Sequence, residues 1–418
     1  MKRTFLSQVL ISLVFFLFAG CSGELTDQEI IQKAAKIHDQ VLTIDTHNDT
    51  PMRFGNPDYN MAERHDPRER GGKVDFPRMK EGGLDGAFFA VFVGQGPRDA
   101  EGNKRVYERA VSTFESIHST IEKNEDIVGL ALTPEDAYRL EKEGKRAIFI
   151  GIENGYTLGN DIGKVKEFYD NGARYITLCH SSNNDICDSS TDKGGPEHDG
   201  LSDFGVEVVK EMNHQGLMVD LSHASDKSFY DAIEVSSAPI IASHSCAWAL
   251  CQNPRNMKDE MLVKLAEKGG VIQICILSGY LVAPEPNPER DAEEAALRAK
   301  YNNFQDLSDE ERDEARKAFG MLREKYPERL ATVKDVVDHI DHVVEVAGID
   351  HIGIGTDFDG GGGIEDCFDV SEMGNITIEL VRRGYTKKDI EKIWGGNIMR
   401  VLREVEKVAQ RPGATESP

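Results

Sequence analysis

The sequence predicts a (β/α)8 barrel of the TIM type. Short runs that are apolar on both faces recur along the chain, as expected of parallel strands covered on both sides. Helical patterns lie between them, and several end at a glycine suited to a left-handed C-cap, such as Gly172 and Gly216. Eight such strands are expected, which is the barrel's number. An open doubly wound sheet is the alternative, but it usually carries fewer units.

Residues 22–408 are expected to form one domain, followed by a frayed tail over residues 409–418. The chain of 418 residues can bury a large core, and no break in composition divides it. Its formal net charge is −24, without a basic stripe, which argues against binding nucleic acid or docking on anionic lipid by charge. A small-molecule or peptide substrate fits this composition better.

The first 21 residues have the composition of a secretory signal. A basic pair precedes an apolar run from Val9 to Phe18, which is too short to span a membrane, and small residues lead to Cys21. The string that ends there also resembles a bacterial lipobox, whose cysteine is lipidated. A plain cleaved signal is the alternative. The sequence predicts an exported protein, held by lipid at Cys21 on the periplasmic or cell-surface side of a bacterial membrane.

The expected elements alternate along the chain. A first helix is expected over residues 26–40, with acidic residues in its first turn. Strands are expected at residues 41–49, 86–93, 146–154, 174–180, 217–223, 239–245, 270–277 and 351–357. Helices are expected at residues 103–124, 162–171, 203–215, 225–236 and 259–268, and two more, 371–383 and 387–406, close the ring.

Two segments exceed a minimal barrel. Residues 52–79 form a polar connection rich in proline, glycine and arginine, which indicates an elaborated loop over the active end. Residues 284–334 are first interrupted by prolines and then densely charged, with surface helices expected at 293–300 and 308–325. Their charges are interpreted as a solvated face.

Histidine, aspartate or glutamate stands at the end of most of the expected strands. The active site of such a barrel lies at the carboxyl ends of its strands. A single histidine there is more often structural, but four of the 12 histidines end four different strands. Imidazole and carboxylate together favour a divalent metal such as zinc. The residues brought to that end are His47, Asp49, Glu153, His180, His223, His244, Asp357 and Asp359.

Two metal ions need several imidazoles and a carboxylate able to span both. We expect Glu153 to be the bridge, with His47 and Asp49 on one ion and His223 and His244 on the other. A water or hydroxide between the ions would have a pKa near ~7 and could attack at neutral pH.

Asp357 and His180 then suit roles other than metal binding. Asp357 could orient the attacking water and carry its proton to a leaving amine, and His180 could donate to the developing oxyanion. Asp359 is a competing base, although a carboxylate that satisfies the turn of four glycines after it is the favoured interpretation.

These motifs resemble the membrane (renal-type) dipeptidases, a family of zinc peptidases. The resemblance runs in order over nearly the whole chain after the signal. It is carried by His47-Asn48-Asp49, Glu153-Asn154-Gly155, Thr177-Leu178-Cys179-His180, Asp220-Leu221-Ser222-His223, Ser243-His244-Ser245, Pro254-Arg255-Asn256 and Gly355-Thr356-Asp357-Phe358-Asp359-Gly360.

The resemblance implies a barrel that cleaves dipeptides with two zinc ions, often accepts a D-residue at the C-terminal position and sometimes opens β-lactams. It places the metal ligands on the five residues assigned above, the catalytic aspartate on Asp357 and a substrate-binding histidine on His180. It also places substrate contacts on Arg255 and Tyr280. A guanidinium there would clamp the free carboxylate of a very short peptide.

Two other functions stay open. Related barrels use such metals for deamination or lactone hydrolysis, but they usually begin with His-x-His where this chain has His47-Asn48-Asp49. A lipoprotein that only binds peptides is the other alternative. The six cysteines besides Cys21 form no Cys-x-x-Cys pair and are interpreted as small buried residues, and whether the chain forms a homodimer stays open.

Overall fold

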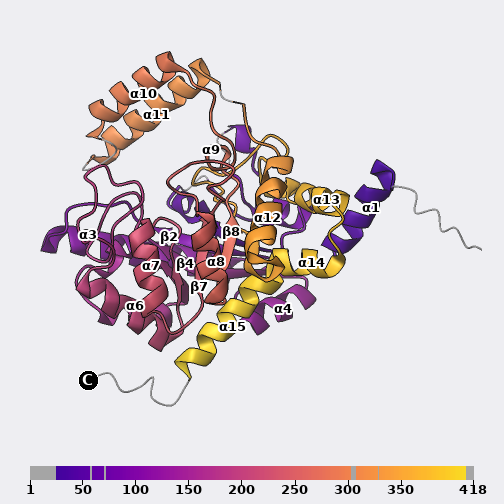
Figure 1. Ribbon diagram of the computed structural model, residues 1–418, viewed down its shortest axis with the longest axis horizontal. Helices are drawn as coiled ribbons and strands as arrows, with labels where there is room; N and C mark the ends of the chain where they lie inside the picture. Colours follow the sequence, from indigo (N-terminus) through magenta and orange to yellow (C-terminus); the bar gives the residue numbers. More distant parts are fainter. Residues whose placement is uncertain (1–24, 57–58, 70–71, 303–306, 328, 411–418) are drawn as a thin grey trace, which may run out of the picture.

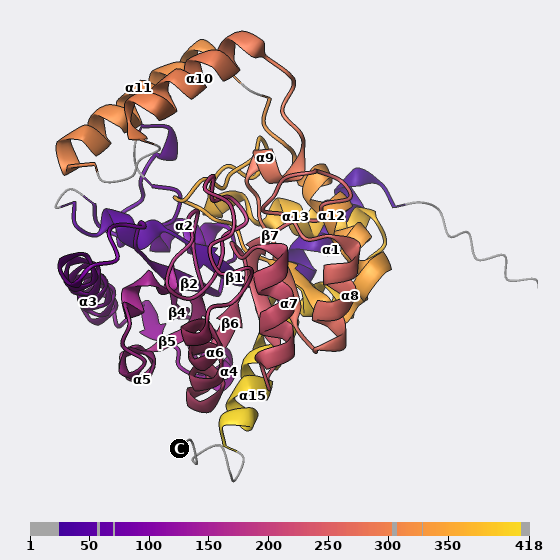
Figure 2. The same ribbon diagram turned by 60° about the vertical axis from the view of Figure 1, so that its left-hand side comes forward.

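A ring of eight parallel strands forms the centre of the molecule (Figures 1 and 2). The computed structural model describes residues 25–56, 59–69, 72–302, 307–327 and 329–410. The ring order is β1-β2-β4-β5-β6-β7-β8-β9, and β3 pairs with β4 outside it. The strands are β1 (Ile44–Asn48), β2 (Gly86–Phe92), β3 (Val128–Leu130), β4 (Arg146–Glu153), β5 (Ala173–Thr177), β6 (Met218–Asp220), β7 (Ile240–Ser245), β8 (Val271–Ile274) and β9 (Ile352–Ile354).

The ring closes between its first and last strands. The backbone N–H of Asp357 donates to the carbonyl of His47 at 2.9 Å, and the N–H of Asp49 donates to the carbonyl of Phe358 at 2.8 Å. Inside the barrel, the aromatic side chains of Phe88 and Phe149 stack, with 4.6 Å between their centroids. The predicted (β/α)8 barrel is therefore confirmed, with all eight expected strands in place.

Helices surround the ring, as both ribbon views show. Local signals set their ends: Thr26 and Glu29 form a capping box before the first helix, and Gly216 ends another in the left-handed region with φ of 89°. The helices are α1 (Asp27–His38), α2 (Phe76–Glu81), α3 (Ala100–Lys123), α4 (Pro134–Lys142), α5 (Gly163–Asp170), α6 (Asp203–Gln215), α7 (Asp226–Val235), α8 (Asp259–Glu267), α9 (Ser278–Leu281), α10 (Pro288–Lys300), α11 (Asp309–Lys325), α12 (Val333–Ala347), α13 (Gly374–Arg382), α14 (Lys387–Glu391) and α15 (Asn397–Ala409).

Several elements depart from the sequence-based expectation. β3, α4 and α12 lie outside the helices and strands named from the sequence, and α2 begins within the segment expected to be an elaborated loop. The expected last helix is divided by a π-helical turn over Lys392–Gly396. The backbone approaches β1 closely there, since a Cβ on Gly395 would lie 2.5 Å from the carbonyl oxygen of Leu42.

The charged insert contains the two expected helices, α10 and α11, although α10 begins earlier, at Pro288, and the two helices form a hairpin. Its own small core joins Tyr301, Ala315 and Phe319. Both ribbon views place the hairpin beyond the barrel end that carries α9, away from α15. The insert therefore stands at the end of the barrel where the strands finish.

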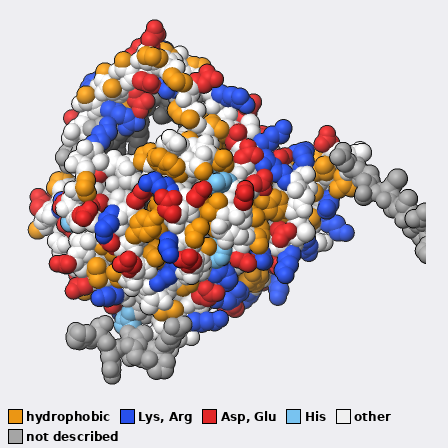
Figure 3. All heavy atoms as spheres, in the orientation of Figure 1, with side chains coloured by type: hydrophobic (Ala, Val, Ile, Leu, Met, Phe, Trp, Pro, Cys, Tyr) orange, Lys and Arg blue, Asp and Glu red, His pale blue; other side chains and the backbone are white. Residues whose placement is uncertain are grey.

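Three expectations fall on residues that the structure does not describe. The signal over residues 1–21, with Cys21, lies outside the described residues, as does the tail beyond residue 410. Within the described part of the chain, no helix is long and apolar enough to cross a bilayer. Acidic and basic side chains are interspersed over the face seen in Figure 3.

Candidate active site

The predicted site residues converge at the carboxyl ends of the strands. Their side chains come from seven of the eight ring strands or from the loops that follow them, and all but two of the residues are buried. The exceptions are His180, whose side chain is 26% exposed, and Tyr280 in α9, which is partly buried. The set is His47, Asp49, Glu153, His180, His223, His244, Arg255, Tyr280 and Asp357.

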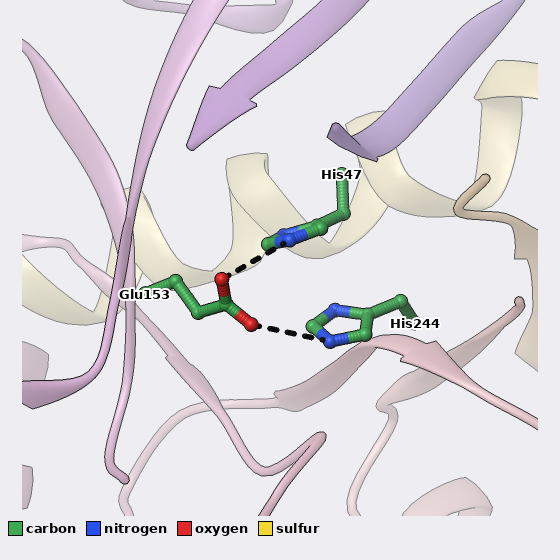
Figure 4. A group of neighbouring side chains, drawn as sticks. All are labelled: His47, Glu153 and His244. Carbon is green, nitrogen blue, oxygen red and sulfur yellow. Dashed lines mark ion pairs between the residues drawn. The ribbon is translucent and has the colours of Figure 1, made fainter. Parts of the chain in front are cut away.

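The carboxylate of Glu153 is the centre of the cluster. Its oxygens lie 3.6 Å from His47 Nε2, 3.1 Å from His223 Nε2 and 3.5 Å from His244 Nε2. Figure 4 shows the imidazoles of His47 and His244, which come from β1 and β7, directed at this carboxylate. Asp49 joins from the other side, with Oδ2 at 3.6 Å from His47 Nε2.

The arrangement fits a divalent metal centre. Two donor atoms bound to one zinc ion in tetrahedral geometry lie roughly 3.3–3.6 Å apart, close to the spacings around Glu153. Among the described residues, His47 Nε2 and Asp49 Oδ1 are buried without a hydrogen-bond partner. The buried carboxylates of Asp49, Glu153 and Asp357 would also repel one another without a cation between them.

Geometry alone does not separate ligands from the other polar groups. Three compact sets have donor atoms within 4.8 Å of one another, and two of them include His180 or Asp357. The assignment of those two residues to roles other than metal binding therefore stays a prediction. The sets are His47, Glu153 and His244; Glu153, His180 and His223; and His47, Asp49 and Asp357.

Two residues to which the sequence assigned no role orient the imidazoles. The hydroxyl of Tyr175 lies 2.8 Å from His47 Nδ1, and the hydroxyl of Ser243 lies 2.8 Å from His244 Nδ1. Because Nδ1 is engaged in each ring, Nε2 is left to face Glu153. No motif marks Tyr175, since it stands within an apolar strand run like any core residue.

Asp45 and Asp220 have structural roles. Asp45 accepts from the N–H and the hydroxyl of Thr356 at 2.7 and 2.8 Å, which ties the first strand to the last. Asp220 accepts from the hydroxyls of Thr177 at 2.5 Å and Ser243 at 2.6 Å. Asp220 therefore positions His244 through Ser243.

The loop after β9 holds Asp357 against the cluster. Asp357 has φ of 58°, and its carbonyl accepts from three successive glycine N–H groups at 3.2, 3.0 and 2.7 Å. A Cβ on the first of them, Gly360, would lie 2.1 Å from Asp49 Oδ2 and 2.2 Å from Asp357 Oδ1. Only glycine lets this turn pass so close to the two carboxylates.

Asp359 lies in a different environment from the one favoured by the sequence. Its carboxylate accepts from the hydroxyl of Thr50 at 2.9 Å, from Arg53 Nε at 2.8 Å and from the backbone N–H of Lys73 at 3.1 Å. These donors belong to the connection after β1, not to the glycine turn. Asp359 thus joins two loops around the site, and its oxygens are engaged away from the cluster.

A buried arginine borders the cluster. Arg255 donates from Nη2 to the carbonyl of His244 at 3.2 Å, and its guanidinium carbon lies 5.3 Å from the centroid of the Tyr280 ring. Its Nε and Nη1 atoms are buried and have no partner among the described residues. A buried cation with two unused donors is suited to bind an anion such as a carboxylate.

Burial is the largest single influence on the pKa of the buried groups in the cluster, although Tyr175, Glu153 and Asp49 raise the pKa of His47 against it. Burial lowers the pKa of His223 and His244 well below the ordinary value, so both imidazoles are neutral, the form that binds metals. Burial, and after it the charge of Arg255, lowers the pKa of His180 to about 3. Burial, and after it the charge of Asp49, raises the pKa of Asp357 well above the usual carboxyl range.

Known proteins resemble this chain over most of its length. The model of the membrane dipeptidase family, peptidase family M19, matches residues 31–416. Dipeptidase tcpJ of Claviceps purpurea is 34% identical over 372 residues, which cover 87% of this chain and 77% of that protein. Dipeptidase verJ of Clonostachys rogersoniana is 32% identical over 392 residues, covering 91% and 88%.

Solved structures resemble the fold as well. The crystal structure of the probable dipeptidase PvdM from Pseudomonas aeruginosa superposes with a TM-score of 0.81 at 31% identity, over 91% of this chain and 100% of that one. A metallo peptidase from Rhodobacter sphaeroides, liganded with a phosphinate mimic of L-Ala-D-Ala, superposes with a TM-score of 0.68 at 22% identity, over 87% and 99%. The second likeness concerns the fold alone.

Proposed function

The chain belongs to the membrane dipeptidase family, peptidase family M19, and we propose that it hydrolyses dipeptides of the form L-Xaa-L/D-Xaa with two zinc ions at the strand-end site. It is a metal-dependent hydrolase of the dipeptidase type. The observation that carries the substrate proposal is the buried guanidinium of Arg255, with two unused donors, beside a cluster of imidazoles and carboxylates. Its position favours a substrate whose free carboxylate lies next to the reacting bond.

The metal ions would be held by nitrogen and oxygen donors around Glu153. His47 and Asp49 would bind one ion, His223 and His244 the other, and Glu153 both, in agreement with the spacings of 3.1–3.6 Å in the cluster. When bound, such ions supply Lewis acidity and lower the pKa of a coordinated water toward ~7.

Arg255 orients the substrate. Its two unused donors suit a bidentate contact with the C-terminal carboxylate. Because the guanidinium is buried beside His244, a longer peptide would have to place a further residue where the protein already lies. The scissile bond of a dipeptide would then fall beside Glu153.

His180 and Asp357 act on the reacting bond. The hydroxyl of Ser181 lies 3.1 Å from His180 Nδ1, so a neutral imidazole that accepts there carries its proton on Nε2. That proton can be donated to the carbonyl oxygen as negative charge develops on it. Asp357, whose pKa is raised by burial, takes a proton from the attacking water and passes it to the leaving amine.

A panel of dipeptides tests the proposal. Release of both amino acids, including from substrates with a C-terminal D-residue, is expected to stop with a chelator and return with zinc. Matched dipeptide amides, which lack the free carboxylate, are expected to be poor substrates. Undiminished activity in the chelator, or equal rates on the amides, would contradict the scheme, and release of ammonia alone would indicate a deaminase.

We also propose that the protein is exported and lipid-anchored at Cys21, on the strength of the signal-like N-terminus. Two or more acyl chains attached to the protein make its membrane attachment stable. Cys21→Ser is expected to prevent incorporation of labelled palmitate and to move the enzyme from the membrane fraction to the soluble fraction. A Cys21→Ser protein that stays with the membrane would contradict a lipid anchor.

A further inference from the structure

A cavity of about 560 Å³ opens over the carboxyl end of β2. Its wall is apolar in part and polar in part: the polar side chains are those of Gln95, in the loop after β2, and of Arg105 and Arg109 on α3. None of the proposed metal ligands or catalytic residues lines it. The residues that form the apolar wall are Met52, Phe92, Val93, Val106, Tyr156 and Leu307.

The cavity borders the reaction centre directly. The ring of Phe92 lies 4.8 Å from that of His180, centroid to centroid, in an edge arrangement. Met52 donates its backbone N–H to the carbonyl of Asp49 at 2.9 Å. Two lining residues therefore contact two residues of the proposed catalytic site, so the cavity lies beside the place where the reacting bond would be held.

The ring order places this cavity opposite the arginine. Arg255 follows β7, which is the sixth strand of the ring, whereas the cavity lies over β2, the second strand. Strands four positions apart in an eight-stranded barrel face each other across its axis. A dipeptide with its carboxylate on Arg255 and its amide beside Glu153 would extend its N-terminal residue toward β2.

The helical hairpin supplies one part of the wall. Leu307 immediately precedes Ser308, which caps α11, and it lines the cavity together with residues of the barrel. Both ribbon views show α10 and α11 reaching over the end of the barrel toward the side that carries α3. The hairpin thus contributes an apolar side chain to a space beside the site.

We propose that this cavity receives the side chain of the substrate's N-terminal residue and selects dipeptides in which that side chain is large and apolar. The proposal rests on the dipeptidase function proposed above and adds its substrate class. Leu307 is then a specificity-determining residue that lies outside the barrel. One buried methylene changes kcat/KM by about tenfold or more in a well-fitted apolar pocket, so the preference should be easy to measure.

Filling the cavity is the direct test. In the wild-type enzyme, kcat/KM is expected to be at least about tenfold higher for Phe-Gly and Leu-Gly than for Ala-Gly. Leu307→Trp is expected to remove that advantage while Ala-Gly is hydrolysed within about twofold of the wild-type rate. Met321→Trp is the matched control, because Met321 lies on the same hairpin, is 65% exposed and does not line the cavity.

The outcomes separate this proposal from the proposed function. Hydrolysis of all three dipeptides without the preference, or a preference that Leu307→Trp leaves intact, overturns the cavity assignment and leaves the dipeptidase standing. Equal loss on Ala-Gly and Phe-Gly in Leu307→Trp also overturns it. Hydrolysis of none of the dipeptides by the zinc-loaded wild type overturns both.

A binding measurement distinguishes a change in substrate affinity from a general effect of the substitution on turnover. Reduced-amide analogues of Phe-Gly and Ala-Gly, which cannot be hydrolysed, can be titrated calorimetrically into the zinc-loaded enzyme. Leu307→Trp is expected to weaken binding of the Phe-Gly analogue by about tenfold and to leave binding of the Ala-Gly analogue unchanged. Met321→Trp is expected to change the affinity for neither analogue. Unchanged affinity for the Phe-Gly analogue would contradict the subsite.

Discussion

At the scale of single residues, the proton carrier and the metal ligands can be told apart by experiment. Asp357 lies within 4.8 Å of donor atoms of His47 and Asp49, so position alone allows it either role. Asp357→Asn keeps the shape of the side chain and removes its basicity. We expect the variant to hold both zinc ions and to lose turnover by about 10²–10⁴-fold.

Metal content measured beside kcat decides the role of Asp357. Asp366→Asn is a suitable control, since Asp366 belongs to the same long connection after β9 but is exposed, and it should change neither quantity. Loss of one zinc equivalent from Asp357→Asn would place this carboxylate among the ligands instead.

Arg255 should act on substrate binding rather than on chemistry. Arg255→Ala removes the two unused donors, and we expect KM for free dipeptides to rise by about tenfold or more, because charge-assisted bidentate contacts are strong. Dipeptide amides, already poor substrates, should change little. If kcat/KM fell equally for amides and free dipeptides, the clamp would be refuted. A circular dichroism spectrum checks that the variant still folds.

The residues of the site differ in how far the sequence could reveal them. His47, Glu153, His223 and His244 each stand at the end of an apolar run, so counting strands along the sequence is enough to bring them together. Tyr175 and Ser243 could not be found in that way. Tyr175 reaches His47 from β5, which is not next to β1 in the ring, and Ser243 meets the ring of the residue that follows it in β7; both contacts depend on how side chains meet in the folded barrel.

At the scale of elements, length and periodicity decided what could be predicted. The eight ring strands were found because each is followed by a polar site residue or a turn. β3 is as short as β6 and β9, but it pairs with one strand only and no candidate site residue follows it, so nothing in the sequence marks it. The position of the hairpin over β2 also lay beyond prediction, because charged surface helices carry no signal for the partner they approach.

The helix α12 makes a pH-dependent contribution that can be measured. His339 is buried, accepts at Nδ1 from the N–H of Ala247 at 3.0 Å and donates from Nε2 to the carbonyl of Leu281 at 2.9 Å. Burial lowers its pKa, and the nearby charge of His342 lowers it further, while the carbonyl of Leu281, Asp338 and Asp335 oppose this shift. The folded protein therefore holds this imidazole neutral.

The sign of the effect follows from proton binding. Below about pH 6.5 the unfolded chain protonates this histidine while the folded chain does not, so the free energy of unfolding falls as the pH decreases toward the lowered pKa. We expect His339→Gln to be less stable at neutral pH but to show a weaker decline in Tm between about pH 6.5 and 5. His214→Gln, at a half-exposed site, should decline as the wild type does, and identical slopes for all three proteins would exclude this role of His339.

At the scale of the whole molecule, the metal centre and the closure of the barrel are expected to depend on each other. The proposed ligands are spread over β1, β4, β6 and β7 or the residues that follow them, so two bound ions would link strands that are far apart in the sequence. Without cations, the buried carboxylates of Asp49, Glu153 and Asp357 repel one another across the ring. Metal binding should therefore stabilise the whole fold, because the unfolded chain has no comparable site.

Titration of zinc into chelator-stripped protein tests this coupling. We expect two tight equivalents per chain, each of which raises Tm because it adds RT ln(1 + [L]/Kd) to the free energy of unfolding, or about 2.7 kcal/mol for a site at 100-fold its Kd. Glu153→Gln should lose most of the binding of both zinc equivalents and of the rise in Tm, since this carboxylate faces the imidazoles of His47, His223 and His244. Arg255→Ala should keep both. Fewer than two equivalents in the wild type would exclude the two-metal centre, and two equivalents without a change in Tm would show that the unfolded chain binds the ions as tightly as the folded barrel does.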